Sequence, residues 1–146
     1  MTYIREFEFY EEEGMVCAVP FGIEGATCGT DLYDALDMAA DWLRLHVLNA
    51  LARGEDFPRG TVGNKPQHGG EVVAVCVEAS LEDVPAMTAS EAASALGVSC
   101  ARVTQLCKAG DLDSWRVGET RMVSEFSVLA RKAGAAKPGH QGFHVV

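Results

Sequence analysis

The segment MTASEAASALGVSCARVTQLCKAGDL, residues 87–112, constrains the fold of this chain more than any other. Its pattern predicts two short helices joined by a tight turn. Thr88 is placed to cap the first helix, and Glu91, three residues later, completes a capping box. Gly97 permits the left-handed conformation that ends a helix, and Ser99 is placed to cap the second helix. The segment therefore predicts a helix-turn-helix unit.

The second helix of this unit, CARVTQLCK, has an apolar and a polar face. Val103, Leu106 and Cys107 recur at the spacing of one helix face and are expected to point inward, and Val98 of the turn is expected to fill the space between the helices. The other face begins with a small residue and continues with side chains that reach phosphates and base edges, as a DNA recognition helix requires. The candidate DNA-binding residues here are Ser99, Ala101, Arg102, Gln105 and Lys108.

A β-hairpin and a third helix are expected next. In WRVGETRMV, residues 115–123, alternating residues flank a Gly-Glu turn, which predicts a hairpin that carries Arg116 and Arg121. These two arginines complete the set of candidate DNA-binding residues. Ser124 is then placed to cap a helix that extends to about Lys132.

This part of the chain resembles the winged helix-turn-helix of the excisionase and MerR-like group. The resemblance rests on TASEAASALGVS, ARVTQLCKAGDL and WRVGETRMVS, and it covers residues 87–133. It implies binding to operator DNA, although the unit could also serve as a protein-protein module. Members of this family often carry more positive charge in the second helix and the wing. Here that charge is reduced by three acidic residues, Asp111, Asp113 and Glu119. Because one copy then makes few phosphate contacts, we expect a homodimer or higher homo-oligomer whose modules read paired half-sites.

The charge of the chain is divided unevenly. Residues 1–85 hold 5 Lys/Arg against 16 Asp/Glu, a net charge of −11, whereas residues 86–146 hold 7 against 5, a net charge of +2. The asymmetry predicts two modules with different partners. We therefore expect an N-terminal domain at residues 1–85, a DNA-binding domain at residues 86–134, and a tail at residues 135–146.

The N-terminal half begins with strand patterns. In YIREFEFY, residues 3–10, aromatic side chains alternate with Glu6 and Glu8, which suit the solvated face of a half-buried sheet. The acidic turn EEEG leads into a second strand at residues 15–21, and a short third strand is expected at residues 26–29.

The apolar period then changes from two residues to between three and four. This spacing predicts an amphipathic helix of about twenty residues that is capped by Asp31 and stopped by Gly54. After a loop at residues 55–70, the continuous apolar run at residues 71–79 predicts a strand in the centre of the sheet. The expected fold class is α+β: a small antiparallel-type sheet with one long packed helix, in the order βββαβ, followed by the α-rich winged helix-turn-helix.

This half resembles HicB-type antitoxins. The resemblance rests on the first strand, the acidic Gly turn, a strand that ends in Pro20, and the stretches GATCGTDLYDALDMAADWL and EDFP, and it covers about residues 3–79. It implies a partial RNase H-like fold without nuclease activity that binds and blocks a small basic mRNA-cleaving toxin, a HicA-like ribonuclease. The candidate contacts for this partner are Glu11, Glu12 and Glu13, whose charge would speed association with a basic protein.

The two resemblances together predict an antitoxin that neutralises a toxin and represses its own operon. One alternative is a stand-alone transcription regulator whose N-terminal domain senses a small ligand or only dimerises. The other is an RNase H-type nuclease, in which converging carboxylates hold two metal ions. Structural roles explain the carboxylates that such a site would use equally well. Glu6 and Glu8 suit a solvated sheet face, and Asp31 and Asp34 suit the start of a helix, so we expect no enzyme.

Other classes are disfavoured by composition. The 5 cysteines form no CxxC pair, and His140 and His144 stand among glycines that disfavour a helix, so we expect no disulfide framework, no metal site and no cofactor. No run of about 18 apolar residues occurs, and the first residues are acidic rather than basic, so we expect neither a membrane span nor a signal peptide. Reduced cysteines and these absences predict a cytoplasmic protein.

Overall fold

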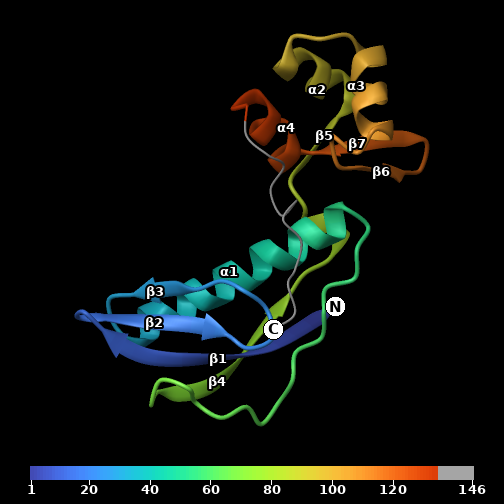
Figure 1. The fold of residues 1–146 in the computed structure, drawn as a ribbon. Helices are drawn as coiled ribbons and strands as arrows, with labels where there is room; N and C mark the ends of the chain where they lie inside the picture. Colours follow the sequence, from blue (N-terminus) through green and yellow to red (C-terminus); the bar gives the residue numbers. More distant parts are fainter. Residues whose placement is uncertain (135–146) are drawn as a thin grey trace. The chain divides into compact units, whose positions relative to one another are not determined.

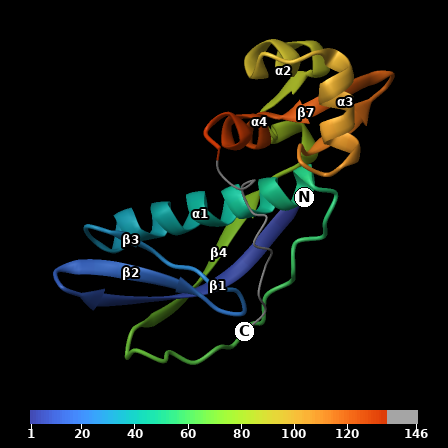
Figure 2. The same ribbon diagram turned by 45° about the horizontal axis from the view of Figure 1, so that its top comes forward.

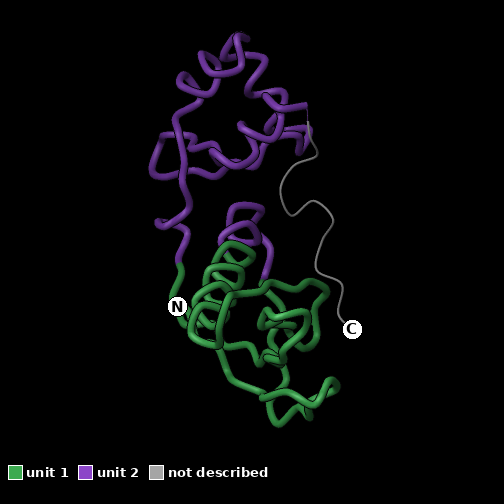
Figure 3. The backbone as a smooth tube through the Cα atoms, turned by 90° about the vertical axis from the view of Figure 1, so that its left-hand side faces the viewer, with its two compact units in different colours: residues 1–47, 57–79, 142–146 green, residues 48–56, 80–141 purple. Residues whose placement is uncertain are grey.

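The computed structural model of the chain describes residues 1–134, which fall into two compact units. Within that range, Figure 3 distinguishes a first unit of residues 1–47 and 57–79 from a second unit of residues 48–56 and 80–134. Both units combine helices with antiparallel strands, so the expected α+β class is confirmed. The histidines singled out in the tail lie outside the described residues.

The sheet of the first unit is antiparallel throughout, with the strand order β3-β2-β1-β4 (Figure 1). Its strands are β1 (Thr2–Glu12), β2 (Met15–Pro20), β3 (Thr27–Gly29) and β4 (Glu71–Glu78). β4 lies at the edge, so the expectation of a central strand was wrong. An apolar run reports how the two faces of a strand are covered and not how many strands pair with it, and within residues 1–134 β4 pairs with β1 alone. Even the two faces differ, since Val75 and Val77 are buried while Ala74 and Cys76 are exposed. The apolar run is therefore covered on one face only.

The turn between β1 and β2 is tighter than the sequence pattern predicts. β1 continues through Glu12, so only Glu13 and Gly14 lie between the strands. Both adopt a positive φ, 52° and 79°, as the type I′ class of two-residue hairpin turns requires. The expected acidic turn is present, but Glu11 and Glu12 belong to the strand.

One helix, α1 (Leu32–Ala52), lies along one face of the sheet (Figures 1 and 2). Its Trp42 meets Phe7 of β1 edge-to-face, with ring centroids 5.8 Å apart. Asp31 caps the helix as predicted, since its Oδ1 accepts a 2.8 Å hydrogen bond from the backbone N–H of Asp34. The helix ends two residues before Gly54, close to the predicted stop. No helix among the described residues combines the length and the apolar character that crossing a membrane demands.

The second unit contains three α-helices and a three-stranded sheet of order β5-β7-β6. Its elements are the 3-10 helix η1 (Leu81–Asp83), β5 (Ala86–Thr88), α2 (Ala89–Leu96), α3 (Cys100–Lys108), β6 (Ser114–Val117), β7 (Thr120–Ser124) and α4 (Glu125–Lys132). The predicted helices and hairpin are confirmed. β5 has only three residues and no alternating pattern of its own, so pairing with β7, rather than local sequence, makes it a strand.

The core of the second unit is small and joins all three helices to the sheet. Its buried side chains are Ala92, Ala93, Val103, Leu106, Leu112, Val123 and Val128. Val98 does not belong to this core, since its side chain is 38% exposed, so its expected role between the helices was wrong. Leu112 and Val123, which come from the segment after α3 and from β7, fill the core instead.

Candidate nucleic-acid interface

The α2–α3 pair is held by the caps that the sequence predicts. The Thr88 hydroxyl accepts a 3.2 Å bond from the backbone N–H of Glu91, and the Glu91 carboxylate accepts a 2.9 Å bond from the backbone N–H of Thr88. Gly97 ends α2 in the left-handed conformation, with φ 67°. Ser99 caps α3 by accepting from the backbone N–H of Arg102 at 3.1 Å. These bonds fix both the start of α3 and the turn before it.

α3 presents the polar face that the sequence predicts. Val103 and Leu106 are buried in the core of the second unit, and Cys107 packs partly buried against it. The residues of the other face are exposed: Ser99, Ala101, Arg102, Gln105 and Lys108. Arg102 and Gln105 lie one turn apart, with Nη1 and Oε1 at 3.4 Å. The exposed face of α3 therefore begins with small side chains and continues to the end of the helix with three long donors.

The β6–β7 hairpin places two arginines directly opposite each other. Arg116 and Arg121 are register partners, so their side chains leave the same face of the hairpin. Nη1 of Arg116 is 3.5 Å from the carbonyl of Glu119, and Nη1 of Arg121 donates to the hydroxyl of Ser114 at 3.1 Å. Within residues 1–134 neither arginine forms an ion pair with a carboxylate. Like charges opposite each other destabilise a hairpin, and a bound anion would relieve that repulsion.

The acidic residues of this unit differ in their surroundings. Asp111 and Glu119 are exposed, as the sequence interpretation assumes. Asp113 is only 8% exposed, and its backbone bonds to Ser124 and Ser127 tie it into the unit. Asp111 and Glu119 therefore lie on the surface of the unit, whereas Asp113 is held inside it.

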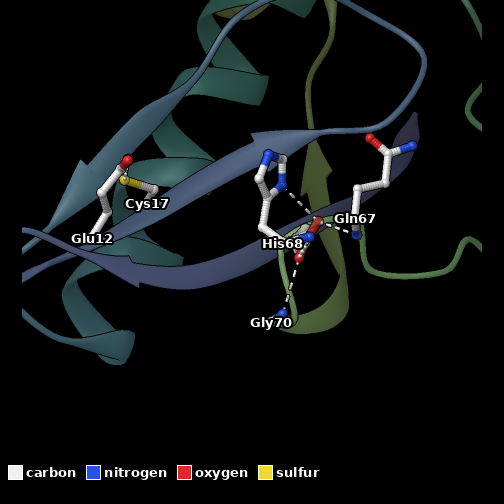
Figure 4. Close-up of polar contacts among 6 residues, drawn as sticks. Glu12, Cys17, Gln67, His68 and Gly70 are labelled. Atoms are coloured by element: carbon white, nitrogen blue, oxygen red, sulfur yellow. Dashed lines mark hydrogen bonds and ion pairs between the residues drawn. The ribbon is translucent and has the colours of Figure 1, made fainter.

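The three candidate contact residues of the first unit lie together at the end of the β1–β2 hairpin. Glu11, Glu12 and Glu13 are all exposed. Figure 4 shows Glu12 beside Cys17 of β2, whose thiol is 3.7 Å from the carboxylate. Burial, and then the Glu12 carboxylate, raise the pKa of the Cys17 thiol. The hairpin end therefore carries an exposed group of carboxylates that a basic partner could reach.

Glu8 was expected on a solvated face, and this was wrong. Its side chain is 1% exposed because the strap, which we define as residues 57–70 between α1 and β4, covers it. The carboxylate accepts bonds from the backbone N–H groups of Gln67, His68 and Gly70 at 2.7, 2.7 and 3.0 Å, and the His68 ring lies 3.1 Å away (Figure 4). Burial acts to raise the pKa of Glu8, but these hydrogen bonds outweigh it and lower the pKa to about 2.

Glu6 holds the strap at a second point. Its carboxylate accepts from the backbone N–H and the side-chain amide of Asn64 at 2.9 and 2.8 Å, and from the backbone N–H of Gly63 at 3.1 Å. The backbone bond from Asn64 is the main reason that the pKa of Glu6 is lowered. The sequence did not predict this role of Glu6. The composition of a loop rich in Gly and Pro does not indicate which distant side chain accepts hydrogen bonds from its backbone N–H groups.

The carboxylates considered for nuclease chemistry therefore have structural partners. Glu6 and Glu8 bind the strap, Asp31 caps α1, and Asp34 accepts from the backbone N–H and hydroxyl of Thr30 at 2.8 and 3.2 Å. The part of the chain that the structure describes contains no group of three or more His, Cys, Asp or Glu side chains arranged to hold a metal ion.

Comparisons of this chain with models of protein families, with curated proteins and with solved structures found no match.

Proposed function

We propose that this protein is a DNA-binding antitoxin, which neutralises a small basic mRNA-cleaving toxin through its first unit and represses its own operon through its second. The observation that carries the DNA-binding part is the exposed set of donors on α3 together with the opposed pair Arg116 and Arg121. Figures 1 and 2 show α3 and the β6–β7 hairpin at the same end of the second unit. A helix with exposed donors beside a basic hairpin suits a major groove and its flanking phosphates.

The toxin-binding part of the proposal is supported by charge and by the resemblance to HicB-type antitoxins. Residues 1–85 carry a net charge of −11, and the exposed Glu11, Glu12 and Glu13 concentrate part of it at one hairpin end. An acidic surface of this kind accelerates association with a basic protein. Residues 86–146 carry a net charge of only +2, so we propose that a homodimer or larger assembly supplies enough phosphate contacts.

The DNA-binding proposal is tested by fluorescence anisotropy with the DNA upstream of the protein's own gene. We expect Arg102→Ala and Arg116→Ala each to weaken binding at least about fivefold, as expected for one lost base or phosphate contact. Each substitution should also lower the slope of log K against log salt by about one if the contact is to a phosphate. The matched control is Arg131→Ala, which removes an exposed arginine of α4 in the same unit. Equal effects of all three substitutions would contradict the proposed interface.

The toxin-binding proposal is tested by co-expression with the product of the adjacent small gene, followed by a growth assay and co-purification. We expect the neighbour to arrest growth alone and to be bound and silenced by this chain. A variant with Glu11, Glu12 and Glu13 all changed to Lys should associate more slowly, while Glu71→Lys, an exposed change on β4, should not. If no neighbour is toxic, or the toxic neighbour does not bind, the antitoxin proposal is wrong while DNA binding is unaffected.

A second candidate function is a transcription regulator whose first unit senses a small ligand. The observation that favours it is a cavity of about 430 Å³ in the first unit, lined by Arg5 and by residues of the strap. Small-molecule sites commonly have volumes of this order. An adjacent gene for a short basic toxin argues for the first function, and an effect of a small molecule on DNA affinity argues for the second.

A further inference from the structure

The cavity of the first unit lies between the end of β2 and the strap. Val19, Pro20 and the segment Phe21–Gly25 form one side, and Pro58, Arg59, Thr61, Asn64 and Gln67 form the other. The side chain of Arg5, from β1, lies in the same lining. The lining therefore combines apolar side chains with two guanidinium groups, two amides and a hydroxyl. Apolar walls with a few polar groups are typical of sites for small organic molecules.

Arg5 is a buried cation that has no counter-ion within residues 1–134. Its side chain is 2% exposed, and burial lowers its pKa. Nη1 donates to the carbonyl of Phe21 at 2.9 Å, Nη2 donates to the carbonyl of Pro58, and the ring of Phe57 lies 5.3 Å from Cζ. Nε has no hydrogen-bond partner, and no carboxylate among residues 1–134 forms an ion pair with this guanidinium. Buried charges are normally paired, because an uncompensated charge in a protein interior is costly.

The backbone is shaped to enclose this guanidinium. A Cβ added at Gly22 would lie 2.9 Å from Nη1, and one added at Gly60 would lie 3.3 Å from Nε. Side chains at these two positions would crowd Arg5, so glycines allow the segment after β2 and the strap to approach it closely. The two carbonyl groups use only two of the five N–H donors of the guanidinium, and the described part of the chain offers the remaining donors no partner of opposite charge.

The other charged groups of the cavity leave it positive. Arg59 is exposed at the strap side of the lining, and Glu24 is the one acidic residue that lines the cavity in the described part of the chain. The nearby carboxylate of Glu6 is already bonded to Gly63 and Asn64. Two guanidinium groups against one exposed carboxylate favour a ligand with negative charge.

We propose that this cavity binds a small organic anion whose carboxylate or phosphate group pairs with Arg5 and Arg59. The apolar side chains of the β2 end would contact the rest of the ligand, and the amides of Asn64 and Gln67 would contact its polar atoms. This inference deepens the second candidate function, because it names the class of ligand that the first unit would sense. The ligand would also join the strap to the segment after β2, since both contribute to its site.

The test uses the full chain and nuclear magnetic resonance of the arginine Nε–H groups. The probes are inorganic phosphate and citrate, titrated at constant ionic strength against sodium chloride. We expect one of them to shift the Arg5 Nε–H signal in a saturable manner, and the comparison shows whether phosphate or carboxylate is preferred. Arg59→Gln should weaken this binding at least fivefold, whereas the matched control Lys65→Gln, an exposed strap residue outside the cavity lining, should change it less than twofold.

Two results would overturn the proposal: a shift that never saturates with either probe, or equal weakening by Arg59→Gln and Lys65→Gln. Either result would show that the anions act only through the general charge of the surface. DNA affinity is measured on the same samples without the probes. The two proposals can therefore fail separately. A protein that does not bind the anions can still bind the operator, and a protein that does not bind the operator can still bind the anions.

Discussion

Replacing Glu8 by Gln should loosen the part of the strap that Glu8 holds against β1. In the native protein one carboxylate oxygen accepts from Gln67, and the other accepts from both His68 and Gly70. An amide keeps a single acceptor oxygen, so at least one strap N–H would face an NH₂ group and the others would lose a charged acceptor. Hydrogen bonds to charged groups contribute about 1.5–3 kcal/mol each, so we expect a loss of about 3 kcal/mol in the free energy of unfolding.

The lowered pKa of Glu8 expresses the effect of these same hydrogen bonds as a dependence of stability on pH. A carboxyl whose pKa falls from 4.5 to about 2 stabilises the folded state by roughly 3 kcal/mol when it is fully ionised. Because the folded pKa lies below the unfolded one, this stabilisation is complete above about pH 5 and is lost as the pH falls toward 2. The difference between the native protein and Glu8→Gln should therefore be largest at neutral pH and should shrink through that acidic range.

The assay is urea unfolding followed by the fluorescence of Trp42, which packs on the sheet of the first unit. A Trp115→Phe background removes the signal of the second unit. Hydrogen exchange of the strap amides that bind Glu8 gives a local readout, and these amides should exchange much faster in the variant. The matched control is Glu71→Gln, which neutralises an exposed carboxylate on β4. Equal losses in Glu8→Gln and Glu71→Gln, or a loss that does not depend on pH, would refute the reasoning.

Three further substitutions test how the two units are built. Gly29→Ala should prevent folding of the first unit, because the added Cβ would lie 2.3 Å from the backbone nitrogen of Ala35 at the start of α1; circular dichroism would show the loss. Thr88→Ala should destabilise the second unit by about 1 kcal/mol in thermal unfolding, because the backbone N–H of Glu91 at the start of α2 loses the hydroxyl oxygen that accepts its hydrogen bond. Gly97→Ala should lower the stability of the second unit by about 1 kcal/mol in the same assay. The loss comes only from holding alanine at a positive φ, because the added methyl group lies in open space.

The controls for these substitutions are chosen to separate local strain from general sensitivity. Gly54 also has a positive φ and open space around an added Cβ, so Gly54→Ala and Gly97→Ala should lower the stability by similar amounts. Ser90→Ala lies in α2 next to the cap and should leave stability nearly unchanged. A folded and stable Gly29→Ala protein would contradict the close contact between β3 and α1.

Local signals in the sequence predicted most of the second unit. The sequence predicts caps at Thr88, Ser99 and Ser124, and each of these side chains accepts the expected backbone hydrogen bond. The sequence also predicts the polar face of α3. These features depend on residues three or four positions apart, so the sequence contains all the information that they need. Val98 was misplaced because the fit of a turn residue between helices depends on how the helices cross.

The features that define the candidate ligand site were beyond the reach of local patterns. Glu8 and the strap amides that it binds lie 59 to 62 residues apart, and Arg5 and Pro58 lie 53 apart. The alternation of β1 indicated which side chains share a face, but not that a loop would return to bury a carboxylate on one side and a guanidinium on the other. The composition of this loop is that of a simple connection, although it supplies five of the thirteen residues that line the cavity.

The sequence alone therefore determined most of the elements, their caps and the division of charge, because these follow from neighbouring residues and simple periodicity. The tertiary structure decided that β5 is a strand, that β4 lies at an edge, and that Arg5 and Glu8 are buried. These outcomes depend on which distant segments meet. The free energy of burying a charge is set by the donors and acceptors that the folded chain brings to it, and no local pattern contains that information.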